Sequence, residues 1–164
     1  MFIAMTFATN TTSPADAAPD PDGGDLSRRI ATALIAREGT GQAWRLELEE
    51  AREGYARVAM RVSAEMLNGF GIAHGGMIFG LADSAFAYAC NSRNVATVAQ
   101  GASITFLDSG RAGEKLVAEA QERALKGRTG VYAVTVRGED GRVVAEFQGL
   151  SRSIGGQIIE GELS

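Results

Sequence analysis

Residues 74–90 read HGGMIFGLADSAFAYAC, and this stretch decides how the chain folds. It is apolar on every side, which predicts a buried central helix that begins near Gly75 and ends near Cys90 or Asn91. Its single charged residue is Asp83. An ionised carboxylate in apolar surroundings is costly unless it is paired or has a chemical task. Asp83 is therefore the first candidate for chemistry, and the alternative is a buried carboxylate held by a neighbouring hydroxyl or backbone group.

The residues before this stretch predict a short helix, a hairpin and a loop. Apolar residues recur at helical spacing between Asp25, which is placed to cap a helix, and Gly39, which is placed to end it. Residues 44–62 then alternate between apolar and polar side chains around a turn near Gly54, as in a half-buried hairpin. Residues 63–76 are rich in Gly and Asn without periodicity, so we interpret them as the loop that leads into the central helix.

Four further strands are predicted after the central helix. They are residues 95–107, 116–126, 131–137 and 143–151, with a Glu-Asp-Gly hairpin signal between the last two. Long consecutive strands favour an antiparallel sheet. We therefore expect an α+β architecture in which a curved sheet of five to six strands wraps around one long central helix. The outer sheet face and any edge strand must then be covered by polar residues or by another subunit.

The composition is that of a soluble domain with a sizeable core. The chain has 164 residues, 45% of them hydrophobic and 22% charged. We expect one domain over residues 25–164, and we interpret residues 1–24, rich in Pro, Ala and Asp from Ser13, as a disordered tail. A net charge of −4 argues against non-specific binding to nucleic acid or to anionic lipid. The apolar stretch is also shorter than the roughly 20 residues that cross a bilayer, so we expect no membrane partner.

One cysteine and one histidine limit the available chemistry. Cys90 has no second cysteine with which to form an internal disulfide, and His74 alone does not make a His-rich metal site. We therefore expect no metal and a reducing, cytoplasmic location. Because Cys90 lies late in an apolar helix, we interpret it as a small core residue and not as a nucleophile.

The predicted order of helix, hairpin, Asn-Gly loop, HGG helix and antiparallel strands resembles the hotdog fold. Over residues 30–162, the chain resembles the phenylacetate-pathway acyl-CoA thioesterases in five sequence motifs: MLNG, HGGMIFGLADSAFAYACNSR, ITFLDSG, TGVY and RSIGGQIIEGE. This resemblance implies hydrolysis of phenylacetyl-CoA or ring-hydroxylated relatives, a homotetramer built from two dimers, and no cofactor. By motif, it implies functional roles for Asn68, His74, Gly75 and Asp83.

Thioester hydrolysis needs a nucleophile and hydrogen-bond donors aimed at the carbonyl oxygen. The first turn of a helix has free N–H groups, and a glycine lets a carbonyl come close, so the Gly75 N–H is the predicted oxyanion contact. Asp83, the predicted base or nucleophile, lies eight residues further on, about 12 Å along the helix. Because reacting atoms must approach to about 3–3.5 Å, a neighbouring subunit must supply one of the two groups. This predicts a dimer with composite sites at its interface.

Asn68 and His74 have two interpretations each. They contact the substrate or its water, or they structure the loop and cap the helix. Lys126 and Arg128, which flank Gly127, are predicted either to pair with coenzyme A phosphates or to form a solvated turn.

One departure from the family pattern lies at the predicted end of a strand. Relatives commonly carry Arg-Pro where this chain has Asp108 and Ser109, which reverses a charge and puts in question how coenzyme A is held. Three alternatives to an arylacetyl-CoA thioesterase remain open at this stage: a hotdog thioesterase with another acyl preference, a hotdog dehydratase that uses His74, and a non-catalytic acyl-CoA sensor.

Overall fold

The computed structural model describes residues 23–160, and the predicted tail lies outside this range except for its last two residues. Those two residues begin helix α1 (Gly23–Arg37). Asp25 therefore lies in the first turn and is not the cap, although its carboxylate still faces the positive end of the helix dipole. The chain turns at Glu38 and enters a short second helix, α2 (Gly39–Ala43), so Gly39 opens a helix where a simple stop was expected.

The predicted hairpin is confirmed as strands β1 (Glu47–Arg52) and β2 (Tyr55–Arg61). Gly54 turns the chain between them with a φ of 68°, in the left-handed region that favours glycine. The predicted loop follows and includes one short 3-10 turn, η2 (Ala64–Met66). The central helix, α3 (Gly75–Asn91), has the predicted bounds.

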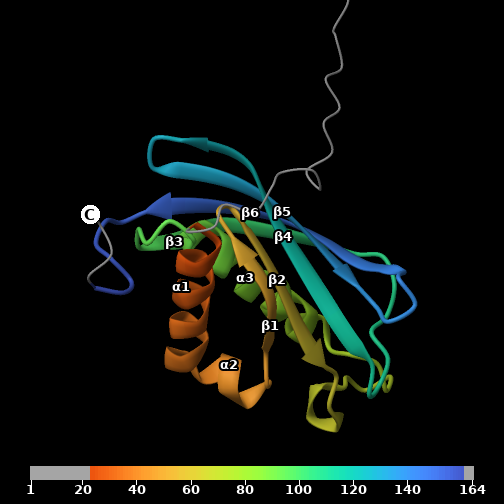
Figure 1. Ribbon diagram of the computed structural model, residues 1–164. Helices are drawn as coiled ribbons and strands as arrows, with labels where there is room; N and C mark the ends of the chain where they lie inside the picture. The colour runs from red at the N-terminus through yellow and green to blue at the C-terminus, as the bar shows by residue number, and fades with distance from the viewer. Residues whose placement is uncertain (1–22, 161–164) are drawn as a thin grey trace, which may run out of the picture.

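Four strands follow α3, close to the predicted ranges: β3 (Thr97–Phe106), β4 (Lys115–Lys126), β5 (Thr129–Arg137) and β6 (Val143–Ser153). All neighbouring strands pair antiparallel, in the order β1-β2-β4-β5-β6-β3. Helix α3 lies in the curve of this sheet, and α1 packs beside it against β1 (Figure 1). The predicted α+β architecture is confirmed.

Small residues let α3 lie close to the sheet. A Cβ atom at Gly149 on β6 would come within 2.8 Å of the Phe86 ring, so a side chain there would push the helix away. Phe86 also packs against Tyr132 and Phe147, with ring centroids 5.3 and 5.9 Å apart. Cys90 is buried in the same core, as expected of a packing residue.

The helix is not covered all round, which corrects the prediction of full burial. Gly76, Gly80, Asp83 and Ala87 follow one another at the three- and four-residue spacing of one helix face, and all four stay at least partly exposed. Strand β3 is equally incomplete, because among residues 23–160 it pairs with β6 alone and its other edge is free. This edge strand also exposes Val98 (46%) and Phe106 (49%).

Candidate active site

His74 is the N-cap of α3. Its backbone is extended, with φ −61° and ψ 135°, and its Nδ1 accepts a hydrogen bond of 2.9 Å from the Gly76 N–H. Its carbonyl oxygen accepts the N–H groups of Met77 and Ile78, which begins the helical ladder. The helix-capping interpretation of His74 is therefore what the contacts support, since the ring holds the first turn in place.

Asn68 organises the loop before the helix. Its Oδ1 accepts the N–H groups of Phe70, at 2.9 Å, and of Ile72, at 3.4 Å, so it closes a turn on its own loop. Gly71 takes a φ of 74° inside this turn. The tip is Phe70, whose side chain is 91% exposed. These contacts support the loop-structuring interpretation of Asn68.

Gly75 offers a free donor. It is the first residue of α3, and no residue in the described part of the chain accepts a hydrogen bond from its N–H. The ring of Phe106, from the end of β3, lies beside it, and a Cβ atom at this position would be 3.1 Å from the Phe106 Cζ. A free N–H at the positive end of a helix, next to an aromatic ring, suits a carbonyl oxygen that gains negative charge.

Asp83 has no structural partner. It is partly exposed, and within residues 23–160 no group donates a hydrogen bond to it or forms an ion pair with it. Desolvation raises the pKa of its carboxyl above the ordinary 3.8. The alternative of a carboxylate held by a hydroxyl or backbone group therefore has no support in the contacts. A raised pKa and a free carboxylate are properties of a general base.

The structure does not bring Asp83 to Gly75 within one chain. Helix α3 is continuous between them, so the two residues are about 12 Å apart along its axis. Asp83 instead lies on the partly exposed helix face described above.

Lys126 and Arg128 lie far from Gly75 in the same chain. They occupy the exposed turn between β4 and β5, and Arg128 donates its Nε–H to the carbonyl of Ser153. Ser153 pairs with Thr97, so this turn lies near the start of β3, whereas Phe106 at the end of β3 contacts Gly75. The two ends of β3 are about 30 Å apart at strand spacing.

The charge reversal at Asp108 is compensated inside the chain. The Asp108 carboxylate lies 3.4 Å from the Arg142 Nε and accepts the N–H of Ser109 at 2.7 Å. These contacts give the sequence departure a structural partner, and no free anion results from it.

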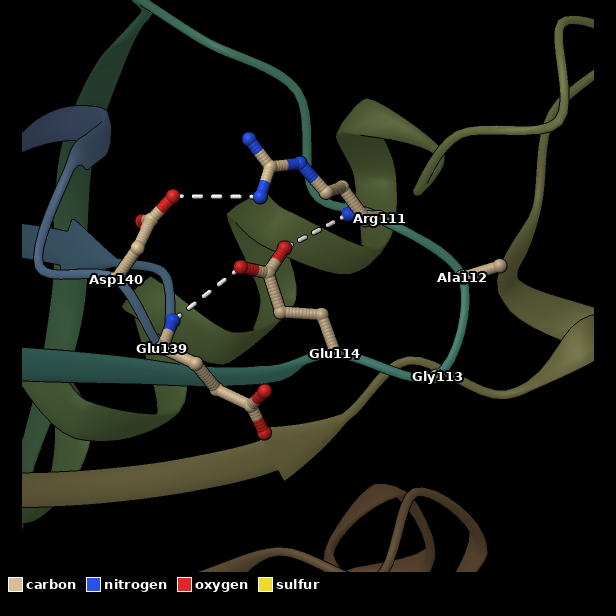
Figure 2. Close-up of a pocket in the computed structure, with 6 residues that line it drawn as sticks. All are labelled: Arg111, Ala112, Gly113, Glu114, Glu139 and Asp140. Carbon is tan, nitrogen blue, oxygen red and sulfur yellow. Dashed lines mark hydrogen bonds and ion pairs between the residues drawn. The ribbon is translucent and has the colours of Figure 1, made fainter.

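Sequence reasoning missed the hollow beside this corner. The hollow has a volume of about 500 Å³. Figure 2 shows Glu114 among its lining residues, where it accepts backbone N–H groups from Arg111 and Glu139. Its lining residues are Arg111, Ala112, Gly113, Glu114, Glu139 and Asp140. The residues that line the hollow come from two separate loops, so no local sequence motif predicts it.

Residues 23–160 offer neither a metal site nor a membrane-spanning helix. No group of three His, Cys, Asp or Glu side chains there is placed to hold a metal ion. No helix of that range is long and apolar enough to cross a membrane.

Known proteins with similar sequences identify the family. A family model described as the thioesterase superfamily matches residues 70–145. The acyl-coenzyme A thioesterase PaaI of Escherichia coli (strain K12) is 44% identical over 128 residues, which are 78% of this chain and 91% of that protein. The chain belongs to the thioesterase superfamily. This thioesterase is thus a thioester hydrolase, and the predicted enzyme class is confirmed.

Solved structures extend the likeness to the fold of this thioesterase. The structure of the E. coli PaaI protein, from the phenylacetic acid degradation operon, has a TM-score of 0.80 at 41% identity and covers 82% of this chain and 97% of that one. A hypothetical thioesterase from Streptococcus pneumoniae TIGR4, solved with coenzyme A, has a TM-score of 0.66 at 27% identity, over 68% of this chain and 90% of that one. The predicted hotdog fold and the resemblance to phenylacetate-pathway thioesterases are confirmed.

The environment of Asp83 predicts an unusual effect on stability. Because burial raises its pKa in the folded state, the ionised carboxylate costs stability above that pKa, and the cost vanishes as the pH falls toward 3.8. Asp83→Asn should therefore leave the free energy of unfolding unchanged or higher at about pH 7, with a difference that shrinks at about pH 4. Urea unfolding at both pH values measures this.

Glu114→Gln is the matched control with the opposite sign. The Arg142 hydrogen bonds lower the pKa of Glu114 to about 2, so its charge stabilises the fold at neutral pH and the contribution is lost in acid. A loss of stability at neutral pH in Asp83→Asn as well would mean that Asp83 holds the fold together.

Proposed function

We propose that this thioesterase hydrolyses phenylacetyl-CoA, or its ring-hydroxylated relatives, to the free acid and coenzyme A at sites shared between two subunits. In each site, Gly75 of one subunit donates its N–H to the carbonyl oxygen and Asp83 of the other acts as base or nucleophile. One observation carries the proposal: α3 is unbroken, so a free N–H donor and an unpartnered carboxylate are held about 12 Å apart in each chain.

The free edge of β3 suggests how two subunits meet. Antiparallel pairing of β3 with its copy would satisfy the exposed N–H and C=O groups of both edges and cover Val98 and Phe106. A two-fold axis through this pair places the end of one β3 beside the start of the other. The first turn of one α3 is then directed toward the partly exposed face of its partner, which carries Asp83.

The same pairing supports a role for the β4–β5 turn. Lys126 and Arg128 of the partner subunit would approach the end of the sheet at which Gly75 lies, because antiparallel strands exchange their ends. Two cations at that end would suit the phosphates of coenzyme A. The likeness to a thioesterase solved with coenzyme A supports this ligand.

The arylacetyl preference rests on the likeness to PaaI and on Phe106. The half-exposed Phe106 ring lies against Gly75, so it offers an aromatic face beside the proposed position of the thioester carbonyl.

Assembly of two dimers into a homotetramer and a cytoplasmic location remain predictions of the sequence.

The reaction follows from this arrangement. Asp83 accepts a proton from a water molecule as the water oxygen bonds to the thioester carbon, or the carboxylate attacks that carbon itself and water then hydrolyses the anhydride. In both routes the carbonyl oxygen gains negative charge, which the Gly75 N–H stabilises. Collapse of the tetrahedral intermediate breaks the carbon–sulfur bond and releases the coenzyme A thiolate, which in the water route takes up the proton that Asp83 accepted.

The function is tested by thiol release from a panel of phenylacetyl, hydroxyphenylacetyl and straight-chain CoA esters. Arylacetyl esters should give the highest kcat/KM, and Asp83→Asn should lose about 10²-fold or more in rate because the base is gone. Asp25→Asn, which removes an exposed carboxylate from α1, is the control and should match the wild type. Two results would contradict the proposal. One is a folded Asp83→Asn variant with full activity. The other is a wild type that binds the esters without hydrolysing them, as the variant does.

The oxyanion donor is tested by Gly75→Pro against Gly75→Ala. Proline is tolerated at the first position of a helix, and the extended backbone of His74 suits a residue before proline, so the substitution deletes the N–H without breaking α3. Both variants place a Cβ atom beside Phe106, but the alanine keeps the donor. Gly75→Pro should have a kcat about 10²–10³-fold below that of Gly75→Ala, and equal kcat values would exclude this N–H as the donor.

A further inference from the structure

A largely buried ion pair joins the loop before β4 to the loop before β6. The Arg142 guanidinium meets the Glu114 carboxylate through two hydrogen bonds, of 2.6 and 2.7 Å, and the side chains are 14% and 6% exposed. Gly138 makes room for both, because a Cβ atom there would be 2.4 Å from an Arg142 nitrogen and 2.5 Å from a Glu114 oxygen. This is a planar, two-bonded pair with a fixed geometry.

Each partner of this pair also holds backbone. Glu114 accepts the N–H groups of Arg111, at 2.8 Å, and of Glu139, at 3.2 Å (Figure 2). Arg142 donates to the carbonyl of Ser109 at 2.7 Å and faces the Asp108 carboxylate at 3.4 Å. The pair therefore fixes the chain on both sides of Gly110.

Gly110 joins that segment to the loop before α3. Its carbonyl accepts the N–H of Ala73 at 2.8 Å, and a Cβ atom on Gly110 would be 2.9 Å from the Ala73 Cβ, so the two backbones are in direct contact. Ala73 immediately precedes the helix cap, His74. At the other end of the same segment, the Phe106 ring touches Gly75. The segment from Phe106 to Gly110 thus contacts the chain at Gly75 and again at Ala73, two residues before it.

We infer that Arg142 and Glu114 are positioning residues for the reaction, which set where the Gly75 N–H lies relative to the thioester carbonyl. This inference rests on the proposed function and deepens it. A buried ion pair is weak evidence for stability, because desolvation offsets much of its attraction. A guanidinium fork has a stronger effect on orientation, and its bonds to Glu114 and to the Ser109 carbonyl hold the segment whose Gly110 accepts the N–H of Ala73, two residues before Gly75.

The test uses a phenylacetyl-CoA analogue in which a CH₂ group replaces the sulfur and the carbonyl carbon is ¹³C. This ketone is not hydrolysed, and its carbonyl stretching band in an infrared difference spectrum reports the hydrogen bond that it accepts. In the wild type we expect the band below its frequency in water. In Arg142→Lys, which keeps the charge but loses the fork, the band should move back toward its frequency in water.

The turnover number of the same variants should fall. A small displacement of the donor is expected to lower the kcat of Arg142→Lys about 10- to 10²-fold, with a much smaller change in KM because the coenzyme A contacts stay. Glu114→Gln keeps the shape of its side chain and should shift the band in the same direction. Arg57→Lys is the matched control: it makes the same substitution at an exposed arginine of β2 whose ion-pair partner is Glu49, so the wild-type band should remain.

Thermal unfolding of each variant separates positioning from stability. If Arg142→Lys and Glu114→Gln unfold earlier but their folded fractions keep the wild-type band and kcat, the pair is purely structural and the inference is wrong. If the wild-type band already matches that of Gly75→Pro, the proposed oxyanion contact itself is wrong and the inference falls with it.

Discussion

The rise of an unbroken α-helix is the constraint on which the rest of this molecule depends. It separates the Gly75 N–H from the Asp83 carboxylate by about 12 Å in every copy of the chain. Under the proposed mechanism, a single chain therefore carries two halves of a hydrolytic site that never meet. The free edge of β3 and the partly exposed face of α3 are the surfaces that a second copy would cover, so an incomplete site and an incomplete fold point to the same assembly.

The close packing of α3 against the sheet explains why this helix can carry the Asp83 carboxylate. Small residues such as Gly149 let the helix approach the strands, and aromatic rings around Phe86 fill the space between them. Phe86 packs there against Tyr132 and Phe147 of the sheet. Asp83 lies on the partly exposed face of the helix, where its desolvation is incomplete and its pKa is raised but no group within residues 23–160 neutralises it. The fold thus keeps a reactive group without relying on it for packing.

Local patterns predicted the parts that are local. The apolar run from Gly75 predicted α3, and the alternation of apolar and polar residues predicted the six strands. Both signals depend on the spacing of apolar residues that are near one another in the sequence. The helix start at Gly23 and the opening of α2 at Gly39 were not predicted, since contacts with the rest of the fold override weak local signals. The Arg142–Glu114 ion pair joins residues from two loops that meet only in the folded chain, so their spacing in the sequence does not predict it. The hydrogen bonds by which Asn68 and His74 hold their loop and cap the helix likewise could not be predicted from their sequence spacing.

Subunit complementation tests the composite site most directly. Dimers that combine one Gly75→Pro chain with one Asp83→Asn chain, isolated through two different tags, contain one site with both groups intact and should show about half of the wild-type activity. Dimers of a wild-type chain with a chain carrying both substitutions have a defect in each composite site and should be inactive. The reverse result, an inactive first dimer and a half-active second one, would mean that each chain contains a complete site and would contradict the account.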